Sequence, residues 1–554
     1  MHDDNARKGL LIETSWEVCN MVGGIYTVLS TKAHTLVDRY GDHYVLIGPD
    51  LSKSHGNQFF LEMPQELAAW QEVAREQGLQ VRVGRWDIPG NPLVVLVDYT
   101  SFWPHKNGLY ATMWEHFQVD SLYAYGDYDE SCIFAYAASV VVESLSRFFH
   151  EETPDTIAHY HEWTTAMGLL HSRFLQPTIT TIFTTHATCI GRSIAGNHHP
   201  LYDQLANYNA DRMADELNIR AKHSLEKQAA HYADVFTTVS EITAKECYYL
   251  LGREPKVTPN GFEERIIPGE AQVDALRISS RQKLLTLAEL LLGRKPALDT
   301  FIVATSGRFE FKNKGYDLFL DSLKTLKESD NPREILAFFF VPAYVGAARE
   351  DLISRCHTDA SSEMPLDSPF ITHALHNYHE DPIVASIHRL GLTNEDDSRV
   401  NVIYVPCYLN GADGILNMSY YATLLGVDAT VFASYYEPWG YTPHESVAFG
   451  VPTITTTLSG FGQWVLSKPT ERTALDPVRV IYRTDSNYHD VVWETADQIR
   501  QLMHLSPVDM EELREKAQVL TQDTLWENFI THYIDAFEEG EQRLMLRTQV
   551  RAID

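Results

Sequence analysis

Short apolar runs alternate with longer periodic stretches along most of the chain. Residues 9–13, 45–47 and 157–160 are largely apolar runs of strand length in the first half, and residues 301–306 and 335–341 repeat the pattern in the second half. Strands that alternate with helices are typical of parallel sheets covered by helices on both faces. The pattern therefore predicts an α/β protein with two such series.

A turn at residues 259–261, Pro-Asn-Gly, separates the two series. We therefore expect a first Rossmann-like domain over residues 1–265 and a second one over residues 266–526. Predicted helices at residues 508–520 and 526–546 close the chain.

Two local patterns are less specific. Residues 212–232 are polar and periodic and predict one long helix. His373, His376 and His379 fall three residues apart on a possible helix, a spacing that permits metal ligation. No second set of ligands accompanies them, so we favour a solvated helix and expect no metal site.

One stretch in the second half is more informative than the rest. Residues 427–433 predict a strand, and the aromatic-rich loop after it carries Glu437. Thr442 as helix cap, Pro443 at the first helical position and Glu445 three residues after the cap match a capping box. A strand whose loop opens a helix directs backbone N–H groups and the positive end of the helix dipole to one spot, which suits a phosphate or diphosphate.

Charge adds a constraint on the partners. The 554 residues include 45 Lys and Arg against 75 Asp and Glu, a formal charge of −30. Such a surface repels nucleic acid and anionic membranes, so we expect neither as a partner. An anionic substrate then requires a local cationic pocket, and Arg308, Lys312 and Lys314 supply one directly after a predicted strand. The alternative is a solvated basic loop.

Cysteine usage and the N-terminus bear on the compartment. Six cysteines are scattered without Cys-x-x-Cys spacing, which suits a reducing compartment and argues against a disulfide framework or a structural zinc. The first residues contain no long apolar core, and no run of about 18 apolar residues occurs. We expect a soluble cytoplasmic protein.

Four motifs resemble those of one enzyme family. Residues 434–443 (SYYEPWGYTP) resemble the nucleotide-binding signature of glycogen synthases of the animal and fungal type, which are retaining glycosyltransferases of the GT-B fold. Residues 16–28 (WEVCNMVGGIYTV), 181–188 (TIFTTHAT) and 306–315 (SGRFEFKNKG) are similar to the family's other site loops. The resemblance covers nearly the whole chain and is weakest over residues 354–398.

The resemblance implies a role for individual residues. It implies that His186 contacts the glucosyl unit and that Arg192 contacts the donor phosphate. It also implies that Arg308 and Lys314 grip the diphosphate, and Glu437 is expected to stabilise the sugar or to orient it. The implied catalytic residues are Glu437, His186, Arg192, Arg308 and Lys314. The implied donor-binding residues are Gly23, Gly24, Tyr420 (at the spacing where the family stacks its uracil ring), Trp439, Gly440, Tyr441, Thr442 and Glu445 (toward the ribose hydroxyls).

The same resemblance implies an architecture and a reaction. We expect a GT-B fold with two Rossmann-like domains facing across a deep cleft, the first on the acceptor side and the second binding the nucleotide sugar. The C-terminal helix, residues 527–554, is expected to cross back onto the first domain. The implied activity is retaining transfer of glucose from UDP-glucose to the non-reducing end of glycogen or another α-1,4-glucan, without a cofactor and with a possible homo-oligomeric state.

Several alternatives stay open. Met21 stands where the starch-type enzymes carry a lysine, which favours UDP over ADP as the donor nucleotide. The chain is poor in cations near residues 506–528, where the eukaryotic enzymes carry an arginine-rich regulatory helix, so that regulation is doubtful. Other hypotheses are a retaining GT-B enzyme that forms a disaccharide, a glucan phosphorylase, or an inert glucan-binding scaffold.

Overall fold

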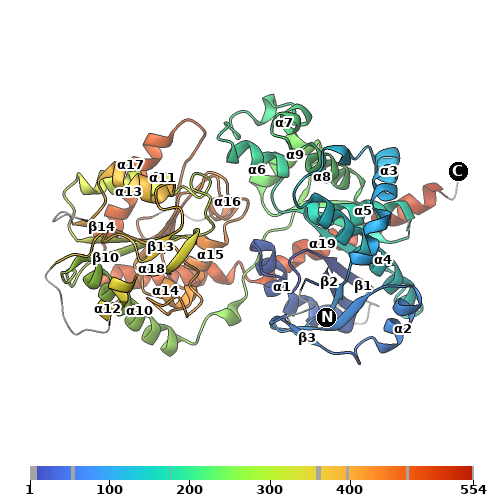
Figure 1. Cartoon of the computed structure of the whole chain (residues 1–554), viewed down its shortest axis with the longest axis horizontal. Helices are drawn as coiled ribbons and strands as arrows, with labels where there is room; N and C mark the ends of the chain where they lie inside the picture. Colours follow the sequence, from blue (N-terminus) through green and yellow to red (C-terminus); the bar gives the residue numbers. More distant parts are fainter. Residues whose placement is uncertain are drawn as a thin grey trace. The chain divides into compact units, whose positions relative to one another are not determined.

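The chain divides into two compact units. Unit 1 comprises Met1–Glu263 and Thr524–Asp554, and unit 2 comprises Glu264–Asp523. The structure, a computed structural model shown in Figure 1, describes residues 9–51, 57–175, 178–356, 364–394, 399–469 and 473–551.

Unit 1 is built on a nine-stranded sheet of order β3-β4-β5-β2-β1-β6-β7-β8-β9. The strands from β5 to β9 in this order run parallel, and β3 and β4 pair antiparallel at one edge. Its central strands are buried along their whole length, as expected for a sheet covered on both faces. The strands are β1 (Leu10–Thr14), β2 (Tyr44–Pro49), β3 (Phe60–Glu62), β4 (Val81–Trp86), β5 (Leu93–Val97), β6 (Thr156–His161), β7 (Thr180–Thr185), β8 (Val235–Thr238) and β9 (Lys256–Val257).

The helices of unit 1 cover this sheet. α5 packs on both α4 and α8, and α19 packs on α1, β7 and β8. By length and composition alone α4 could cross a membrane, but two thirds of its apolar window is buried inside the unit, which identifies a core helix. The helices are α1 (Gly24–Tyr40), α2 (Ala68–Glu76), α3 (Lys106–Phe117), α4 (Tyr128–Phe149), α5 (Trp163–Leu175), α6 (Cys189–Gly196), α7 (Ala210–Glu216), α8 (Arg220–Tyr232), α9 (Glu241–Leu251) and α19 (Trp526–Arg551).

The single long helix predicted over residues 212–232 is wrong. The structure has α7 and α8 there, separated at Asn218, whose φ of 56° lies in the left-handed region. Asn tolerates this conformation better than most residues, and one such residue ends a right-handed helix. The sequence pattern does not show the break, because α7 buries Ala214 and α8 buries Ala221 and Leu225 at spacings that one continuous helix would also allow.

Unit 2 contains a six-stranded, fully parallel sheet of order β14-β11-β10-β15-β16-β17. With the six strands of this sheet numbered in chain order, this is the 3-2-1-4-5-6 order of doubly wound nucleotide-binding folds. Its strands are β10 (Phe301–Ser306), β11 (Ile335–Phe340), β14 (Val400–Val405), β15 (Ala429–Phe432), β16 (Thr453–Thr456) and β17 (Val478–Ile481).

Helices lie on both faces of this second sheet (Figure 1). α11 packs against α13 and α17, whereas α10 packs against α14 and α15 against α18. The helices are α10 (Glu270–Leu292), α11 (Tyr316–Lys327), α12 (Glu350–Cys356), α13 (Pro382–Leu390), α14 (Tyr420–Leu425), α15 (Tyr441–Ala448), α16 (Gly460–Ser467), α17 (Tyr488–Met503) and α18 (Pro507–Gln522).

The histidine-rich segment forms no helix. His373 lies in β13 (His373–Leu375), which pairs antiparallel with β12 (Val345–Ala348), and His376 and His379 lie in the turn that follows. The predicted solvated helix is therefore wrong. A strand followed by a turn also does not place residues three apart on one face. Pairing with β12, a tertiary contact, decided the structure of this segment.

Strand order changes direction at one point in each sheet. In unit 1, β1 lies between β2 and β6, and later strands are added outward on both sides of it. In unit 2, β10 lies between β11 and β15 in the same way. At such a switch point the loops at the carboxyl ends diverge, and ligands bind there. The loops after β1, β6 and β7 and those after β10 and β15 carry most of the predicted site residues.

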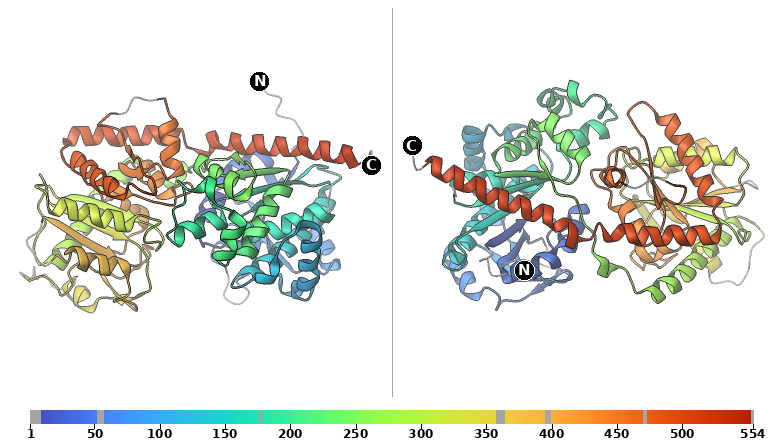
Figure 2. Two further views of the ribbon diagram at one scale, coloured as in Figure 1. Left: turned by 90° about the horizontal axis from the view of Figure 1, so that it is seen from above. Right: turned by 180° about the vertical axis from the view of Figure 1, so that it is seen from behind.

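The C-terminal helix α19 completes the core of unit 1. It runs along unit 1 in both views of Figure 2. Trp526 is 2% exposed, and its ring N–H donates to the Thr31 hydroxyl at 2.8 Å. Further along the helix, Tyr533 donates to the Thr258 carbonyl at 3.3 Å. The helix thus buries side chains that unit 1 needs.

We predict that Trp526→Ala destabilises unit 1 by about 3–5 kcal/mol, because it removes a buried ring and leaves a cavity. Trp493→Ala is the matched control, since Trp493 is 62% exposed on α17, and it should change stability by less than about 0.5 kcal/mol. Native-state hydrogen exchange measures both effects, because it reports the free energy of opening of each unit separately. Equal effects of the two substitutions would contradict this role of α19.

Candidate active site

The glycine pair of unit 1 begins α1 beside a buried carboxylate. Glu17 accepts hydrogen bonds from the N–H groups of Gly23 at 2.7 Å and Tyr26 at 2.8 Å. A carboxylate at this position neutralises the positive end of the helix dipole. Gly24 has open space where a Cβ would lie, and Met21 is 62% exposed. This loop therefore suits an uncharged ligand better than a phosphate.

Three glutamates hold the loop that carries His186: Glu226 and Glu246 are buried, and Glu162 is partly buried. The four successive N–H groups of residues 186–189 all donate to carboxylates: the first two to Glu162 at 2.9 and 3.1 Å, the third to Glu246 at 3.2 Å and the fourth to Glu226 at 2.8 Å. Burial raises the pKa of Glu162 despite the nearby charge of Arg192. Burial, with Glu162 as the next cause, raises the pKa of Glu226 to about 8. The loop is fixed at every residue.

These three glutamates are functional candidates that the sequence did not reveal. Glu226 and Glu246 lie on α8 and α9, where a glutamate is usually solvated. Glu162 directly follows β6 and has a φ of 67°, which is unusual for a residue with a side chain. Its position after a buried strand was the one available signal.

His186 and Arg192 lie on the same short segment of unit 1. His186 is 9% exposed, and its ring Nε2 lies 3.1 Å from Nδ1 of His161. Arg192 is an exposed residue on α6, whose first turn is capped by the Thr188 hydroxyl accepting from the Gly191 N–H at 2.9 Å. The structure thus places a fixed imidazole and an exposed guanidinium at the carboxyl end of β7.

In unit 2, Lys314 and Glu437 form an ion pair. Lys314 Nζ lies 2.6 Å from Glu437 Oε2, and the side chains are only 13% and 10% exposed. The Ser434 hydroxyl donates to the same carboxylate oxygen at 3.2 Å. The loops after β10 and β15, predicted separately, therefore meet at this pair.

The backbones of these two loops also touch. The Asn313 carbonyl accepts from the N–H groups of Tyr435 at 2.8 Å and Tyr436 at 3.1 Å. Gly315 has a φ of 72°, and a Cβ there would lie 1.8 Å from the Ala433 carbonyl oxygen. Glycine at this position is what allows Lys314 to reach Glu437.

The other predicted cations are more exposed than Lys314. The Arg308 side chain is 52% exposed and lies 3.0 Å from Glu310, and Lys312 is exposed. The Arg308 carbonyl accepts from the hydroxyl of the buried Tyr316 at 3.0 Å, which fixes its backbone. Arg308 is thus anchored at its main chain with its guanidinium near solvent.

The predicted capping box at Thr442 is wrong. The helix cap is Gly440, with a φ of 107° and no side-chain cap, and α15 begins at Tyr441. Glycine adopts this conformation readily and starts the helix earlier than the Thr-Pro pair suggested. Glu445, free of a capping role, accepts from the Tyr421 hydroxyl at 3.0 Å, and burial raises its pKa to about 7.

The remaining predicted donor-binding residues differ in exposure. Tyr420 is partly buried and its hydroxyl lies 3.0 Å from that of Ser306, at the end of β10. Tyr441 is also partly buried. Trp439 is 4% exposed, and its ring N–H donates to His444 at 3.3 Å inside unit 2. The Trp439 side chain therefore supports the loop from within.

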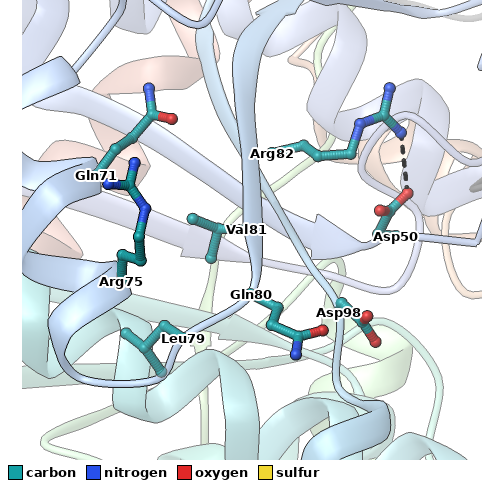
Figure 3. A pocket seen from close by; sticks show the side chains of 8 residues that line it. All are labelled: Asp50, Gln71, Arg75, Leu79, Gln80, Val81, Arg82 and Asp98. Carbon is teal, nitrogen blue, oxygen red and sulfur yellow. Dashed lines mark hydrogen bonds and ion pairs between the residues drawn. The ribbon is translucent and has the colours of Figure 1, made fainter.

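A pocket elsewhere in unit 1 contains none of the predicted site residues. Figure 3 shows it beside β4, with Arg82 paired to Asp50 at 3.1 Å on its wall. Its volume is about 380 Å³. The lining residues are Asp50, Gln71, Arg75, Leu79, Gln80, Val81, Arg82 and Asp98.

Two groups of potential metal ligands occur within the described residues. In the group Glu13, His159 and His161, the ammonium of Lys32 lies 2.6 Å from Glu13 and already supplies the positive charge. The second group is His373, Cys407 and Asp413. There both ring nitrogens of His373 are hydrogen-bonded, one to the Asp413 carbonyl at 2.9 Å and one to the Thr372 hydroxyl at 2.8 Å. Neither group includes a predicted site residue.

Comparison with known sequences shows a match to one protein family. The family model described as "Glycogen synthase" matches residues 13–355 and 347–550. The "Glycogen [starch] synthase, liver" of Homo sapiens is 34% identical over 528 residues, which are 84% of this chain and 74% of that protein. The "Glycogen [starch] synthase" of Neurospora crassa is 30% identical over 592 residues, which are 95% of this chain and 83% of that protein.

Solved structures match the fold at low identity. The catalytic domain of starch synthase IV from Arabidopsis thaliana, bound to ADP and acarbose, has a TM-score of 0.59 at 14% identity and covers 97% of this chain and 100% of that one. An α,α-trehalose-phosphate synthase (UDP-forming) from Burkholderia xenovorans has a TM-score of 0.55 at 11% identity, covering 95% and 100%. The predicted GT-B fold class is confirmed.

We predict that Gly315→Ala destabilises unit 2 by more than Gly391→Ala does. Both glycines have a positive φ, 72° and 65°, so each alanine pays about 1–2 kcal/mol for the left-handed conformation. A Cβ at Gly391 meets nothing within 4 Å, whereas one at Gly315 collides with Ala433. Denaturant titration of both variants measures the difference. Equal losses would show that the two loops are not in close contact.

Proposed function

The chain belongs to the glycogen synthase family and is a glycosyltransferase, and we propose that it transfers glucose from UDP-glucose to the non-reducing end of an α-1,4-glucan with retention at the anomeric carbon. The observation that carries this proposal is the Lys314–Glu437 pair at the switch point of unit 2. A cation for a phosphate and a carboxylate for a sugar stand side by side where doubly wound sheets bind nucleotides.

The reaction separates charge, and unit 2 offers a group for each charge. As the bond between sugar and phosphate breaks, negative charge develops on the diphosphate and positive charge on the sugar ring. In the proposed mechanism Arg308, Lys314 and the N-terminus of α15 stabilise the diphosphate, and Glu437 stabilises or orients the sugar. Arg308, Lys314 and the N-terminus of α15 supply the positive charge that a divalent metal supplies in other enzymes. We therefore propose a reaction without a metal cofactor.

Unit 1 supplies the second proposed set. His186 would contact the transferred glucosyl unit and Arg192 the donor phosphate. The rigid hold of three carboxylates on residues 186–189 supports this role, because positioning contributes to rate only when the group is held in place. The glycine pair at Gly23 and Gly24, with its helix dipole already neutralised, suits the uncharged sugar.

The nucleotide site is proposed around α14 and α15. Tyr420 would stack on the base, and Glu445 would accept hydrogen bonds from the ribose hydroxyls. Trp439, Gly440, Tyr441 and Thr442 form the loop and first turn that face the donor in this proposal. The exposed Met21, where starch-type enzymes carry lysine, supports UDP as the nucleotide. The free thiols of Cys19, Cys132, Cys189, Cys247 and Cys407 support a cytoplasmic location.

A transfer assay tests the proposed function. UDP-glucose and ADP-glucose, each labelled in the sugar, are incubated with the protein and either glycogen or a panel of small sugars. We expect label in glycogen and a preference for UDP-glucose. Label in a small sugar alone would favour a disaccharide-forming enzyme, and hydrolysis or transfer from neither donor would favour a glucan-binding scaffold.

We predict that Glu437→Gln lowers turnover by a factor of about 100 or more, as removal of one preorganised charge partner does. Arg308→Ala should have a comparable effect. Glu328→Gln is the control, because Glu328 is exposed and its ion pair among the described residues is with Lys324, one helical turn earlier. Turnover of Glu437→Gln at the level of the control would refute the assigned role.

Donor binding should strengthen as pH rises from 6 to 8. Burial raises the pKa of Glu445 to about 7, so its carboxylate, the better acceptor for ribose hydroxyls, forms across this range. The dissociation constant of UDP-glucose, whose diphosphate does not titrate here, should fall by up to about tenfold. Glu445→Gln should flatten the profile. An unchanged pH dependence in this variant would contradict the ribose contact.

A further inference from the structure

A buried polar cluster lies beneath His186 in unit 1. Glu13 on β1 is fully buried, and Lys32 Nζ and the Tyr44 hydroxyl contact its two carboxylate oxygens at 2.6 and 2.5 Å. Nε2 of His161 lies 3.2 Å from the same carboxylate, and Nδ1 of His161 lies 3.1 Å from Nε2 of His186. An unbroken line of hydrogen-bonding groups thus runs from Glu13 to His186.

The charge state of each group follows from its surroundings. Burial alone would raise the pKa of Glu13, but Lys32, His159 and His161 outweigh it and hold that pKa well below its usual range. Burial, with His159 as the next cause, lowers the pKa of His161 to about 3. Burial and His161 likewise hold the pKa of His186 well below its usual range. At neutral pH the carboxylate is ionised and the imidazoles are neutral.

These states fix the position of every proton in the line. An ionised carboxylate only accepts hydrogen bonds, so Nε2 of His161 carries a proton and donates to Glu13. A neutral imidazole has one N–H, so Nδ1 of His161 is an acceptor and Nε2 of His186 must donate to it. His186 therefore has a bare Nδ1. Among the described residues no hydrogen bond engages this atom.

We propose that Glu13 is a positioning residue that acts through His161 to present Nδ1 of His186 as a hydrogen-bond acceptor for a hydroxyl of the transferred sugar. The proposal rests on the proposed function for the contact between His186 and the sugar. Lys32 sets the direction of the line. If Glu13 were protonated, it could donate to His161, the line would reverse, and Nδ1 of His186 would become a donor.

His159 offers a matched comparison with His161. Both lie on β6 two residues apart, both are buried, and Nδ1 of His159 lies 2.9 Å from the Glu13 carboxylate. The other nitrogen of His159 meets the Thr184 hydroxyl at 2.6 Å, not His186. A role in stability alone would make the two histidines equivalent, whereas the proposed line passes through His161 only.

Nitrogen NMR of the histidine-labelled full chain tests the proton positions. His186 is assigned by the signals lost in His186→Asn. We expect a protonated Nε2 and a bare Nδ1 in the unmodified protein, and the reverse in Lys32→Met. A protonated Nδ1 in the unmodified protein overturns the proposal. Because the free protein is measured, this result does not depend on the enzyme's substrate, whereas absent transfer to glycogen overturns only the proposed function.

Kinetics of two phenylalanine variants test the consequence. His161→Phe should lower kcat by about tenfold or more, with a smaller change in KM, because the imidazole of His186 loses its fixed tautomer. His159→Phe should lower kcat much less, because Lys32 still pairs with Glu13 and the line through His161 remains. Equal losses in the two variants would overturn the proposal.

Donor analogues that each lack one sugar hydroxyl complete the test. The unmodified protein should discriminate against the analogue that lacks the hydroxyl facing His186. His161→Phe should discriminate less against that analogue and equally against the others. Identical discrimination by both proteins would show that the line does not act on the sugar.

Discussion

The ion pair between Lys314 and Glu437 is the interaction on which unit 2's candidate site depends. Removing two charges from water costs several kcal/mol per ion, and their attraction does not reliably offset it, so a buried pair is weak evidence for stability. The chain nevertheless brings the two loops together, with glycine at residue 315 and the Asn313 carbonyl closing the gap. We infer that the pair is kept because each partner acts on the donor.

The two units use their switch points differently. In unit 1, Glu17 neutralises the start of α1, and three glutamates accept from the N–H groups of residues 186–189. In unit 2, α15 begins at a glycine without a side-chain cap, beside a lysine. The same topology thus provides one helix start that a carboxylate already neutralises and one that is open to an anion. This difference supports the proposal that unit 2 binds the diphosphate, in addition to the proposed contact from Arg192 of unit 1.

Much of the fold was predictable because burial on both faces produces apolar runs with clear ends. The apolar runs at residues 157–160 and 335–341 correspond to β6 (Thr156–His161) and β11 (Ile335–Phe340). The pairing of Lys314 with Glu437 was not predictable, because 123 residues separate them and only the strand order brings β10 beside β15. Resemblance supplied both residues but not their contact.

The failures have equally specific causes. The Thr442 capping box depended on side-chain spacing, but the backbone of Gly440 decided where α15 begins. Glu226 and Glu246 look like surface residues of polar helices, and only the packed structure shows that their carboxylates hold the loop of His186. Sequence patterns record which residues are apolar, but not which polar residues are buried with them.

Calorimetric titration of UDP into the unmodified protein and Glu437→Gln tests the central claim most directly. In this account Lys314 leaves Glu437 and binds the diphosphate instead. Glu437→Gln removes the carboxylate charge, so Lys314 no longer has to leave an ion pair, and the repulsion between Glu437 and the diphosphate is lost. The variant should then bind UDP more tightly while its turnover collapses. Binding that weakens together with turnover would contradict this account, because Glu437 would then support the nucleotide site itself.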